Sequence, residues 1–322
     1  MSRKKLSQAY TSKPLTNYST GIFNNAEDFI ATKILPIFPV QEVAGDVYGY
    51  GNEALRIVDT ARAVYGSYNK VNLRVQKTGL YKLEDFGLFG ELFEEDYRDA
   101  EQPIDPELDT TEYITQKLML DMEAKTADVL QDPAIITQNV ALSGADRWDQ
   151  YSTSDPLADI ELARTTVFDA IGKAPNTIIL SWKVLFTLKN HPAIKAFFPW
   201  AAKITSDMVV QAMGELLGFE KVLVGKVKQN ENNLDSATQT LSNVWDDVAI
   251  VAYIETTPRK KSTTLGWTFA NQASWRVRKL GQNDIGKESV TSNLAGIIGV
   301  NMYYDQVIVD TRCAYLIYDV LS

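Results

Sequence analysis

The sequence contains one cysteine, one histidine and no long run of apolar residues. A single cysteine, Cys313, excludes an internal disulfide and a cluster of thiolate metal ligands. It lies in the apolar run 307–321, so we interpret it as a small buried hydrophobe. Only His191 is available for a catalytic triad or a zinc site, and zinc sites usually draw on several histidine or cysteine ligands. His191 precedes Pro192 at an expected helix end, so we assign it a structural role and predict no catalytic, cofactor-binding or metal-binding residue.

No apolar run reaches the ~20 residues that a membrane-spanning helix needs. The longest candidates, such as 248–254, have the length of a strand. The start, MSRKK, imitates the charged region of a signal peptide, but the polar segment LSQAYTSKPLTNYST follows it. We therefore expect a soluble protein that is made in the cytoplasm and has no membrane contact.

The net charge of −9 argues against a protein that binds nucleic acid directly, because such proteins carry basic patches. The charge is uneven along the chain. Residues 84–132 contain 16 acidic and 3 basic residues, so the rest of the chain has a positive balance. This acidic stretch has two interpretations: a solvated helix face, or a surface that repels other polyanions.

At 322 residues, 45% of them hydrophobic, the chain can form one large or two medium domains. Residues 1 to about 33 are polar and cannot form a core of their own, so we expect a neighbouring subunit to hold this arm. In 34–47, Pro36 and Pro39 exclude a helix and favour extended structure.

A hairpin is expected next. Leu55-Arg56-Ile57 alternates on the way out, 66–69 is a turn candidate, and Val71, Leu73 and Val75 alternate on the way back. A ribbon with arms of about 33 Å is marginal in water and needs a surface to lie on. Its basic residues, the predicted assembly contacts, are the electrostatic complement of the acidic stretch; they are Arg56, Arg62, Lys70, Arg74 and Lys77.

The stretch 155–198 carries the clearest local signals. Asp155 can cap a helix with Pro156 at its first position, and Gly172 and Pro175 end that helix. Residues 176–180 predict a buried strand, and Ser181 can cap a second helix that stops before His191. The apolar stripe of the first helix is Leu157, Ile160, Val167, Phe168 and Ile171, with Arg164 as a charged break.

The remaining elements are less sharply marked. A long helix is predicted over 109–130, capped by Asp109, Thr110 or Thr111, with Ile114, Leu118, Met122 and Val129 on one face. Another helix, after the stretch 155–198, is capped by Ser206 or Asp207 and ends at Gly218. Polar linkers or loops are predicted at 147–154 and 228–243, and strands at 219–227, 245–255, 265–270, 274–280 and 288–319.

Three motifs imitate ligand sites. Residues 281–288 nearly match a phosphate-binding P-loop, but Glu288 stands where Ser or Thr is required, so we prefer a turn. Gly49-Tyr50-Gly51 leads into a strand rather than the helix of a dinucleotide fingerprint. The runs 94–96 and 105–112 lack the glycine and spacing of a calcium loop, so a solvated charge run is the better interpretation.

Several further motifs occur in a fixed order along nearly the whole chain. They are Leu35-Pro36-Ile37-Phe38-Pro39-Val40, Tyr81-Lys82-Leu83-Glu84, Pro175-Asn176-Thr177, Asn190-His191-Pro192, Leu217-Gly218-Phe219, Leu265-Gly266-Trp267-Thr268-Phe269 and Ala314-Tyr315-Leu316-Ile317. With the order of arm, hairpin, acidic helix, α/β domain and terminal strands, they make the chain resemble the tailed-bacteriophage major capsid proteins.

This resemblance implies an α+β fold of the Hong Kong 97 type. The implied parts are an N-terminal arm and lead-in strand (1–47), an E-loop hairpin (48–82), a P domain with a long spine helix (83–150), an α/β A domain (151–285) and a C-terminal return to the P domain (286–322).

The resemblance also implies a function. Family members self-assemble as pentamers and hexamers into an icosahedral shell that encloses double-stranded DNA without sequence-specific binding, and each E-loop lies across the P domain of a neighbour. The expected partners are further copies of the chain, a separate scaffold protein, a portal and, in some shells, a cementing protein. The expected location is the virion, after assembly in the host bacterial cytoplasm; no cofactor is expected.

Two alternatives stay open. The first is an encapsulin, a bacterial shell of the same fold that encloses a cargo enzyme. The order of the motifs distinguishes it poorly from a phage capsid protein. A neighbouring gene would distinguish them: a terminase indicates a phage, and a cargo enzyme indicates an encapsulin. An α/β enzyme is the more distant alternative, because two carboxylates can suffice for hydrolysis although no intact catalytic motif is present.

Overall fold

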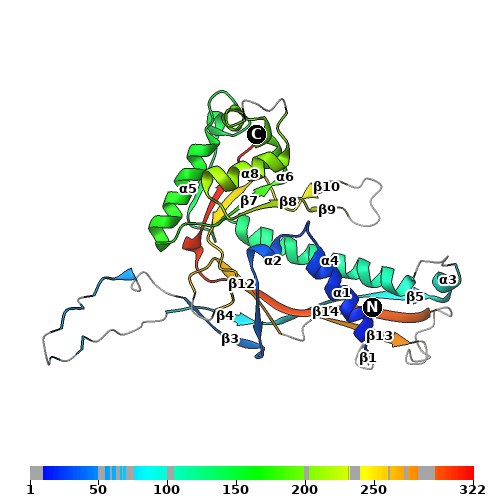
Figure 1. Cartoon of the computed structure of the whole chain (residues 1–322). Helices are drawn as coiled ribbons and strands as arrows, with labels where there is room; N and C mark the ends of the chain where they lie inside the picture. Colours follow the sequence, from blue (N-terminus) through cyan, green and yellow to red (C-terminus); the bar gives the residue numbers. More distant parts are fainter. Residues whose placement is uncertain are drawn as a thin grey trace.

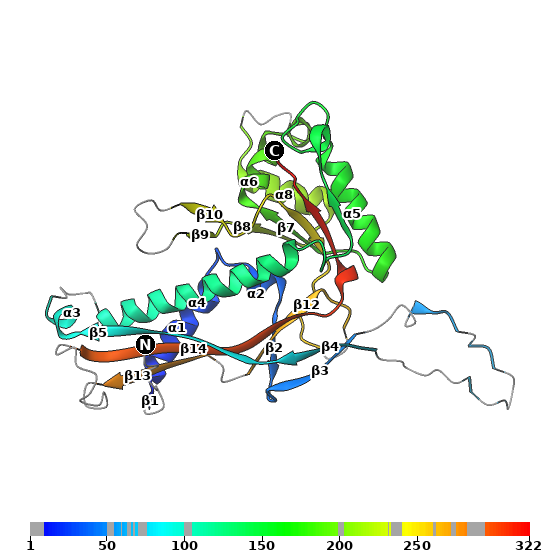
Figure 2. The same cartoon turned by 180° about the vertical axis from the view of Figure 1, so that it is seen from behind.

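In the part of the chain that the structure describes, two large β-sheets pack with helices, and two two-stranded ribbons accompany them, one at the base of a projecting hairpin (Figure 1). The computed structural model describes residues 10–49, 55–58, 60–62, 66, 68–69, 76–99, 105–198, 203–230, 232, 240–259, 262–271, 275–281 and 294–322. The turned view in Figure 2 shows the long helix α4 running along the six-stranded sheet towards the five-stranded one.

The six-stranded sheet is built around β14, a strand of 15 residues. β14 pairs antiparallel with β5, with β13 and with β12. The order is β1-β13-β14-β12-β2, with β5 paired to β14 outside this path. The strands are β1 (Tyr10–Thr11), β2 (Ile37–Val40), β5 (Glu84–Phe93), β12 (Gly266–Asn271), β13 (Arg276–Gly281) and β14 (Leu294–Ile308).

β2 is the terminal strand of this sheet and pairs parallel with β12. The amide of Thr268 donates to the carbonyl oxygen of Pro36. The backbone N–H and C=O groups of successive residues point to opposite sides of a strand. The backbone groups of Phe38 and Val40 therefore point towards β12, and the backbone of Pro39 faces away from it. A proline is tolerated at that edge position, where its missing N–H breaks no ladder bond.

Helix α4 (Pro106–Gln131) packs on β5 and β14 and begins three residues before the predicted start. Asp105 caps it by accepting a hydrogen bond from the amide of Glu107 at 3.0 Å, so the predicted caps at 109–111 are wrong. Pro106 at the first helical position explains this start. The predicted face is confirmed for Ile114, Leu118 and Met122, whereas Val129 is half-buried beside the buried Leu130. The short helix α3 (Glu94–Asp99) follows β5.

The N-terminal segment is held by its own chain. We call residues 10–34 the strap; it contains β1, helix α1 (Lys13–Asn25) and helix α2 (Ala31–Ile34). α1 packs on α4 and β13, and the buried Ser19 hydroxyl lies 2.6 Å from Oγ1 of Thr115. The expectation that a neighbouring subunit holds the arm is therefore wrong for the strap, because its few apolar side chains, such as Leu15, Ile30 and Ile34, are buried in its own chain and hydroxyl contacts add to them.

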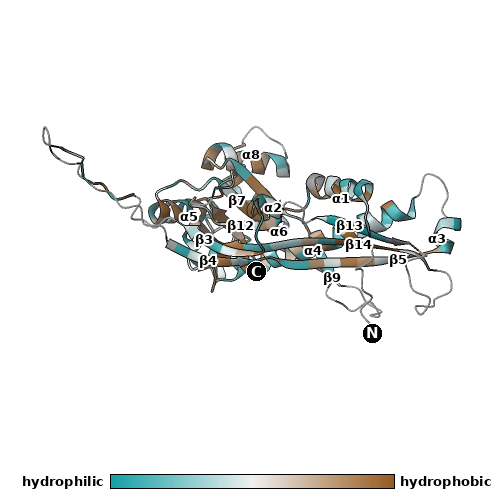
Figure 3. Cartoon of the chain, turned by 90° about the horizontal axis from the view of Figure 1, so that it is seen from below, coloured by the Kyte–Doolittle hydropathy of each residue, from teal (hydrophilic) through white to brown (hydrophobic). Residues whose placement is uncertain are grey.

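A two-stranded ribbon forms the base of the hairpin. β3 (Ala44–Gly49) and β4 (Gln76–Lys82) pair antiparallel, with a register shift between Val47 and Tyr48. The described residues between them extend away from both sheets (Figures 1 and 3). Residues 55–58 lie beyond the described ladder, so the alternation at 55–57 does not mark a paired strand there; 71–75 lie outside the described residues.

The five-stranded sheet has the order β6-β15-β11-β7-β8. Every residue of β7 and of β11 is buried, which agrees with their continuous apolar sequences and confirms the predicted strands there. β11 runs antiparallel to β7 and β15, and β8 runs parallel to β7. The strands are β6 (Asn139–Ala141), β7 (Thr177–Ser181), β8 (Lys221–Gly225), β11 (Ala249–Ala252) and β15 (Ala314–Tyr318).

The helices of this part are α5 (Pro156–Ile171), α6 (Trp182–Asn190), α7 (Pro192–Lys195) and α8 (Ser206–Leu217). Asp155 caps α5 and Ser181 caps α6, as predicted. Gly172 and Gly218 have φ of 68° and 67°, a left-handed conformation that ends α5 and α8 and favours glycine. Thr205, not Ser206 or Asp207, caps α8.

Three other expectations differ from the structure. Phe168 is 51% exposed and Ala163 takes its place on the buried face of α5. The predicted linker 147–154 contains Trp148, which is fully buried and donates from Nε1 to Asp159 at 2.8 Å; a short 3₁₀ helix, η3 (Gly144–Asp146), precedes it. In the predicted loop 228–243, β9 (Lys228–Asn230) pairs with β10 (Leu241–Asn243).

The predicted domain boundaries stay a prediction. Strand pairing shows which sheet the strands within each predicted range join. β12 and β13, within 151–285, belong to the six-stranded sheet. β14 returns to that sheet, whereas β15 follows the 3₁₀ helix η5 (Thr311–Cys313) into the five-stranded sheet. Among the described helices, none has the length and apolar character needed to cross a membrane.

Candidate assembly surfaces

The hairpin residues predicted as assembly contacts are placed as follows. Arg56 is exposed, and the guanidinium carbon of Arg62 lies 4.3 Å from the ring centre of Tyr68. Nζ of Lys77 lies 2.7 Å from Oδ1 of Asp46 at the ribbon base, and this hydrogen bond holds the pKa of Asp46 below its ordinary value. Lys70 and Arg74 lie outside the described residues.

The same hairpin exposes apolar side chains. Ile57 is 95% exposed and Leu55 is 63% exposed. Exposed apolar groups that alternate with an arginine are typical of a segment that a partner covers. This signal was readable in the sequence only as a strand-like alternation.

A row of exposed carboxylates follows β5, α3 and α4. We call the exposed acidic residues of these elements the acidic surface: Glu84, Asp85, Glu91, Glu94, Glu95, Asp96, Asp109, Asp121 and Asp128. Other acidic residues of the stretch have structural roles. Glu107 accepts from the hydroxyl of Tyr97 and contacts Nζ of Lys279, and Asp105 caps α4.

The hairpin and the acidic end of α4 lie at opposite ends of the molecule. Figures 1 and 2 show the described hairpin residues on one side and α3, with the start of α4, on the other. A contact between these oppositely charged ends therefore requires a second copy of the chain.

A groove of about 720 Å³ lies between β2 and the ribbon base. Its lining includes five aromatic residues, two carboxylates and Arg259; the aromatic residues are Phe38, Tyr48, Tyr81, Trp267 and Phe269, and the carboxylates are Glu42 and Asp46. Tyr81 stacks on Phe269 with ring centres 4.5 Å apart, so the floor of the groove is rigid. Sequence reasoning missed this groove, because its walls come from three separate segments.

A buried carboxylate joins the strap, α4 and the segment before β11. Oε2 of Glu123 accepts hydrogen bonds from the amides of Ile30 (3.0 Å) and Ala31 (2.7 Å), and Oε1 accepts one from Nε1 of Trp245 (2.7 Å). Burial raises the pKa of Glu123, and the three donors oppose that shift. Sequence reasoning did not single out this residue.

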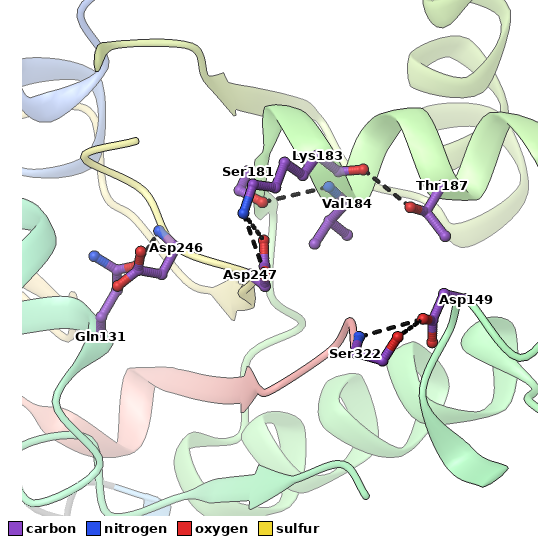
Figure 4. A network of polar contacts seen from close by, with 9 residues as sticks. All are labelled: Gln131, Asp149, Ser181, Lys183, Val184, Thr187, Asp246, Asp247 and Ser322. Atoms are coloured by element: carbon purple, nitrogen blue, oxygen red, sulfur yellow. Dashed lines mark hydrogen bonds and ion pairs between the residues drawn. The ribbon is translucent and has the colours of Figure 1, made fainter. Parts of the chain in front are cut away.

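The end of α4 is tied to the same segment. Oε1 of Gln131 accepts from the amide of Asp246 at 2.6 Å, and its Nε2 donates to the carbonyl of Val244 at 3.1 Å (Figure 4). The segment 244–246 is thereby held to α4 on both sides of Trp245. Figure 4 also shows the ion pair between Lys183 of α6 and Asp247 of the same loop. The Nζ and Oδ1 atoms of this pair are 3.2 Å apart.

Ser154 and His191 form a pair that imitates a nucleophile and its base. Nε2 of His191 lies 3.1 Å from Oγ of Ser154, but Nδ1 accepts a hydrogen bond from the amide of Ala193. In the neutral ring, Nε2 then carries the proton and donates it, so it cannot take one from Ser154. Burial lowers the pKa of His191, which favours the neutral ring. The predicted structural role of His191 is confirmed as the cap of α7.

The other motifs that the sequence singled out are placed as follows. Cys313 is fully buried, and burial raises the pKa of its thiol, as expected for a small buried hydrophobe. Asp96 caps the start of α3 by accepting from the amide of Phe93 at 2.8 Å. Among the described residues, no three His, Cys, Asp or Glu side chains gather as metal ligands would. Residues 282–288 of the P-loop imitation lie outside the described residues.

Two curated proteins resemble the sequence. The chain is 25% identical over 250 residues to the major capsid protein of Burkholderia phage BcepMu, which covers 74% of this chain and 75% of that relative. It is 26% identical over 200 residues to the major capsid protein of Pseudomonas phage JBD67, which covers 62% of both. No protein-family model matches the chain.

Solved structures resemble the fold over almost the whole chain. A phage-related protein of Bordetella bronchiseptica RB50 has a TM-score of 0.74 at 23% identity and covers 97% of this chain and 98% of that one. A virus-like particle from Pyrococcus furiosus has a TM-score of 0.56 at 14% identity, with 95% and 98% covered. The capsid of cyanophage P-SCSP1u has a TM-score of 0.52 at 9% identity, with 88% and 86% covered.

The two sheets, the long helix between them and the projecting hairpin are therefore the phage capsid fold, of the Hong Kong 97 type. Within that class, the sequence relatives confirm the prediction of a tailed-phage major capsid protein.

Proposed function

We propose that this chain assembles as pentamers and hexamers into an icosahedral shell that encloses double-stranded DNA, and that the hairpin of each copy lies on the acidic surface of a neighbour. The observation that carries this proposal is the separation of the basic hairpin from α3 and the acidic start of α4, which lie at opposite ends of one molecule. The proposed basic contacts are Arg56, Arg62, Lys70, Arg74 and Lys77.

The exposed apolar side chains of the hairpin support an intersubunit role. Covering Ile57 and Leu55 on a neighbour removes apolar surface from water, which is the general driving force of association. Charge complementarity sets the register and the rate of encounter rather than most of the affinity. Lys77 is already paired with Asp46 in its own chain, so we expect it to contribute less to this contact than Arg56, which is exposed.

The proposed partners are further copies of the chain, a separate scaffold protein, a portal and, in some shells, a cementing protein. The virion is the proposed location, after assembly in the bacterial cytoplasm. Parts of the acidic surface that face the interior would keep enclosed DNA from adhering to the wall, because like charges repel. No sequence-specific DNA contact is proposed.

A non-enzymatic role fits the polar clusters that were tested above. In the described residues the nearest imitation of a catalytic pair, Ser154 and His191, has the wrong hydrogen-bonding arrangement for proton abstraction. An encapsulin-type shell is the weaker alternative, because both sequence relatives are named as phage capsid proteins.

The contact is tested by reversing charge on the hairpin. The triple variant Arg56→Glu, Arg62→Glu, Arg74→Glu should fold normally and fail to form closed shells in negative-stain electron microscopy, alone and with its candidate scaffold. The matched control carries lysine at the same three positions and should assemble, because it keeps the charge. Normal shells from the glutamate variant would overturn the contact.

A second arm locates the receiving surface. Asp109 and Asp128 are exposed acidic residues of α4. Asp109→Lys with Asp128→Lys should restore part of the assembly of the glutamate variant, because the opposite charges meet again. If instead substitutions of Glu42 in the aromatic groove restore assembly, the hairpin is received in the groove and not on the acidic surface.

A further inference from the structure

The carboxylate of Glu123 is fully buried near the middle of α4. A buried charge is costly unless every oxygen is compensated by donors or an opposite charge. Here the compensation comes from three N–H donors, and Lys33 of α2 is the cation that acts on the carboxylate. The ionised side chain therefore depends on the presence of all three donors.

Those donors come from two parts of the molecule that do not follow one another in the chain. The amides of Ile30 and Ala31 belong to the strap, more than 90 residues before Glu123. The indole of Trp245 lies 122 residues after it, in the segment that leads into β11. One carboxylate thus receives two bonds from the strap on one oxygen and a bond from the segment before β11 on the other.

The five-stranded sheet fixes the position of the indole. A Cβ added to Gly225, at the end of β8, would lie 2.2 Å from Cδ1 of Trp245, so the ring rests directly on that strand. Gln131, at the end of α4, binds Asp246, and Lys183 of α6 pairs with Asp247 (Figure 4). The indole therefore lies between α4 and the five-stranded sheet, and a movement of one relative to the other strains either its packing on Gly225 or its bond to Glu123.

The two ends of the strap are held more firmly than its middle: Ile30, Ala31 and Ile34 are buried, and β1 pairs with β13. Within α1 the buried side chains are Leu15 and Ser19, and an isolated helix of 13 residues is marginal in water. Its polar attachments include the Ser19–Thr115 contact and the bond from Nε1 of Trp275 to Oγ of Ser19, both 2.6 Å. Ser12, Thr16 and Tyr18 form further hydrogen bonds to β13 and α4. Because α1 buries few side chains, its docking responds to changes in the bonds that hold the strap.

We propose that Glu123 is a latch that couples docking of the strap to the position of the five-stranded sheet. With the indole in place, the carboxylate is compensated and binds the strap amides. When the indole moves away, the buried carboxylate loses one of its hydrogen-bond donors. Release of the strap then costs less free energy, because it exposes the carboxylate to water. By linkage, release of the strap weakens the indole bond to the same extent. This inference concerns the single subunit and does not depend on the proposed shell.

A double-mutant cycle on the full chain tests the latch. The variants are Trp245→Phe, Glu123→Gln and their combination, and the readout is hydrogen exchange of the strap amides 13–34 by mass spectrometry. Trp245→Phe should raise the exchange rate of these amides about tenfold, the effect of losing one hydrogen bond to a charged group. In the Glu123→Gln background the same substitution should have a smaller further effect, because glutamine is uncharged and its single acceptor oxygen cannot serve the strap amides and the indole together.

The matched control is Trp275→Phe. It makes the same chemical change and removes an indole bond that reaches the strap directly, through Ser19 and not through Glu123. It should raise strap exchange about fivefold in both backgrounds, since a neutral hydrogen bond contributes about 1 kcal/mol. This difference separates a general loosening by loss of an indole from coupling through Glu123.

The latch is overturned if Trp245→Phe leaves strap exchange unchanged, or raises it equally with and without Glu123. Where Trp245→Phe does not fold, benzothienylalanine introduced at position 245 keeps the fused ring and lacks the N–H. It should reproduce the tenfold effect; unchanged exchange in that variant overturns the latch in the same way. Because no step requires assembly, failure of the proposed shell leaves this test intact.

Discussion

The two sheets of this chain are stabilised in different ways. In the five-stranded sheet, β7 and β11 are buried along their whole length, and one core joins them to α5, α6 and α8. The six-stranded sheet has smaller, separate clusters, and its strands and ribbon expose Leu80, Leu88 and Phe89. Figure 3 shows apolar and polar stretches side by side along these long strands. The central strands of the five-stranded sheet are therefore buried on both faces, whereas the long strands of the other sheet and its ribbon expose apolar side chains.

The largest expected effect comes from a matched pair of leucines, one in each part. Leu180→Ala in β7 leaves a cavity in the core and should lower the free energy of unfolding by about 2–5 kcal/mol. Leu80→Ala in β4, where the side chain is 63% exposed, should change it by less than about 0.5 kcal/mol. Urea unfolding of both variants measures the difference, and equal losses would contradict the division between a stabilising sheet and an exposed one.

A matched pair of glycines, one against Trp245 in the five-stranded sheet and one in α1, extends the comparison. Gly225→Ala forces a Cβ against the indole of Trp245 and should lower the free energy of unfolding by about 1–3 kcal/mol. Gly21→Ala in α1 meets open space within 4 Å and should raise it by about 0.5–1 kcal/mol, because alanine favours a helix over glycine. Thermal unfolding of the two variants tests both signs; a tolerated Gly225→Ala would mean that the indole is free to move.

The smallest expected effect is a pH dependence in the five-stranded part. Burial holds the pKa of His191 below 6.5, against the opposing charge of Asp155. Since the folded-state pKa is the lower one, the stability due to the neutral ring is present above the unfolded pKa and is lost as pH falls through the folded pKa. The one histidine gives a single ring signal in NMR, whose titration midpoint should lie below 6.5.

The matched variant for this prediction is His191→Asn, since asparagine also caps helices. It should keep the fold and flatten the dependence of stability on pH below about 6.5, the ordinary histidine pKa. A midpoint at or above 6.5 in the wild type would show that burial does not govern this ring.

Local signals were readable from the sequence and long-range ones were not. Asp155, Ser181 and Gly218 act within a few residues, so their capping roles follow from neighbouring sequence alone. Trp148 was hidden in a polar segment, because its burial depends on α5 and on the end of the chain.

The candidate surfaces divide in the same way. The basic hairpin and the acidic stretch were visible as charge patterns, although their positions at opposite ends of the molecule were not. Glu123 looks like any helical glutamate in sequence; its donors are brought to it only by the folding of segments about a hundred residues away. The aromatic groove was missed for the same reason.

The outward-facing Pro39 has a consequence for how copies of this chain avoid unwanted association. Terminal strands of sheets are templates for runaway pairing between chains, and proline on such an edge blocks it. β2 presents Pro39 at its free edge, so another chain cannot extend the six-stranded sheet there through an unbroken row of backbone bonds. A protein that must reach high local concentration is thereby protected from fibrous aggregates at this edge, and its association is left to the geometry of side chains.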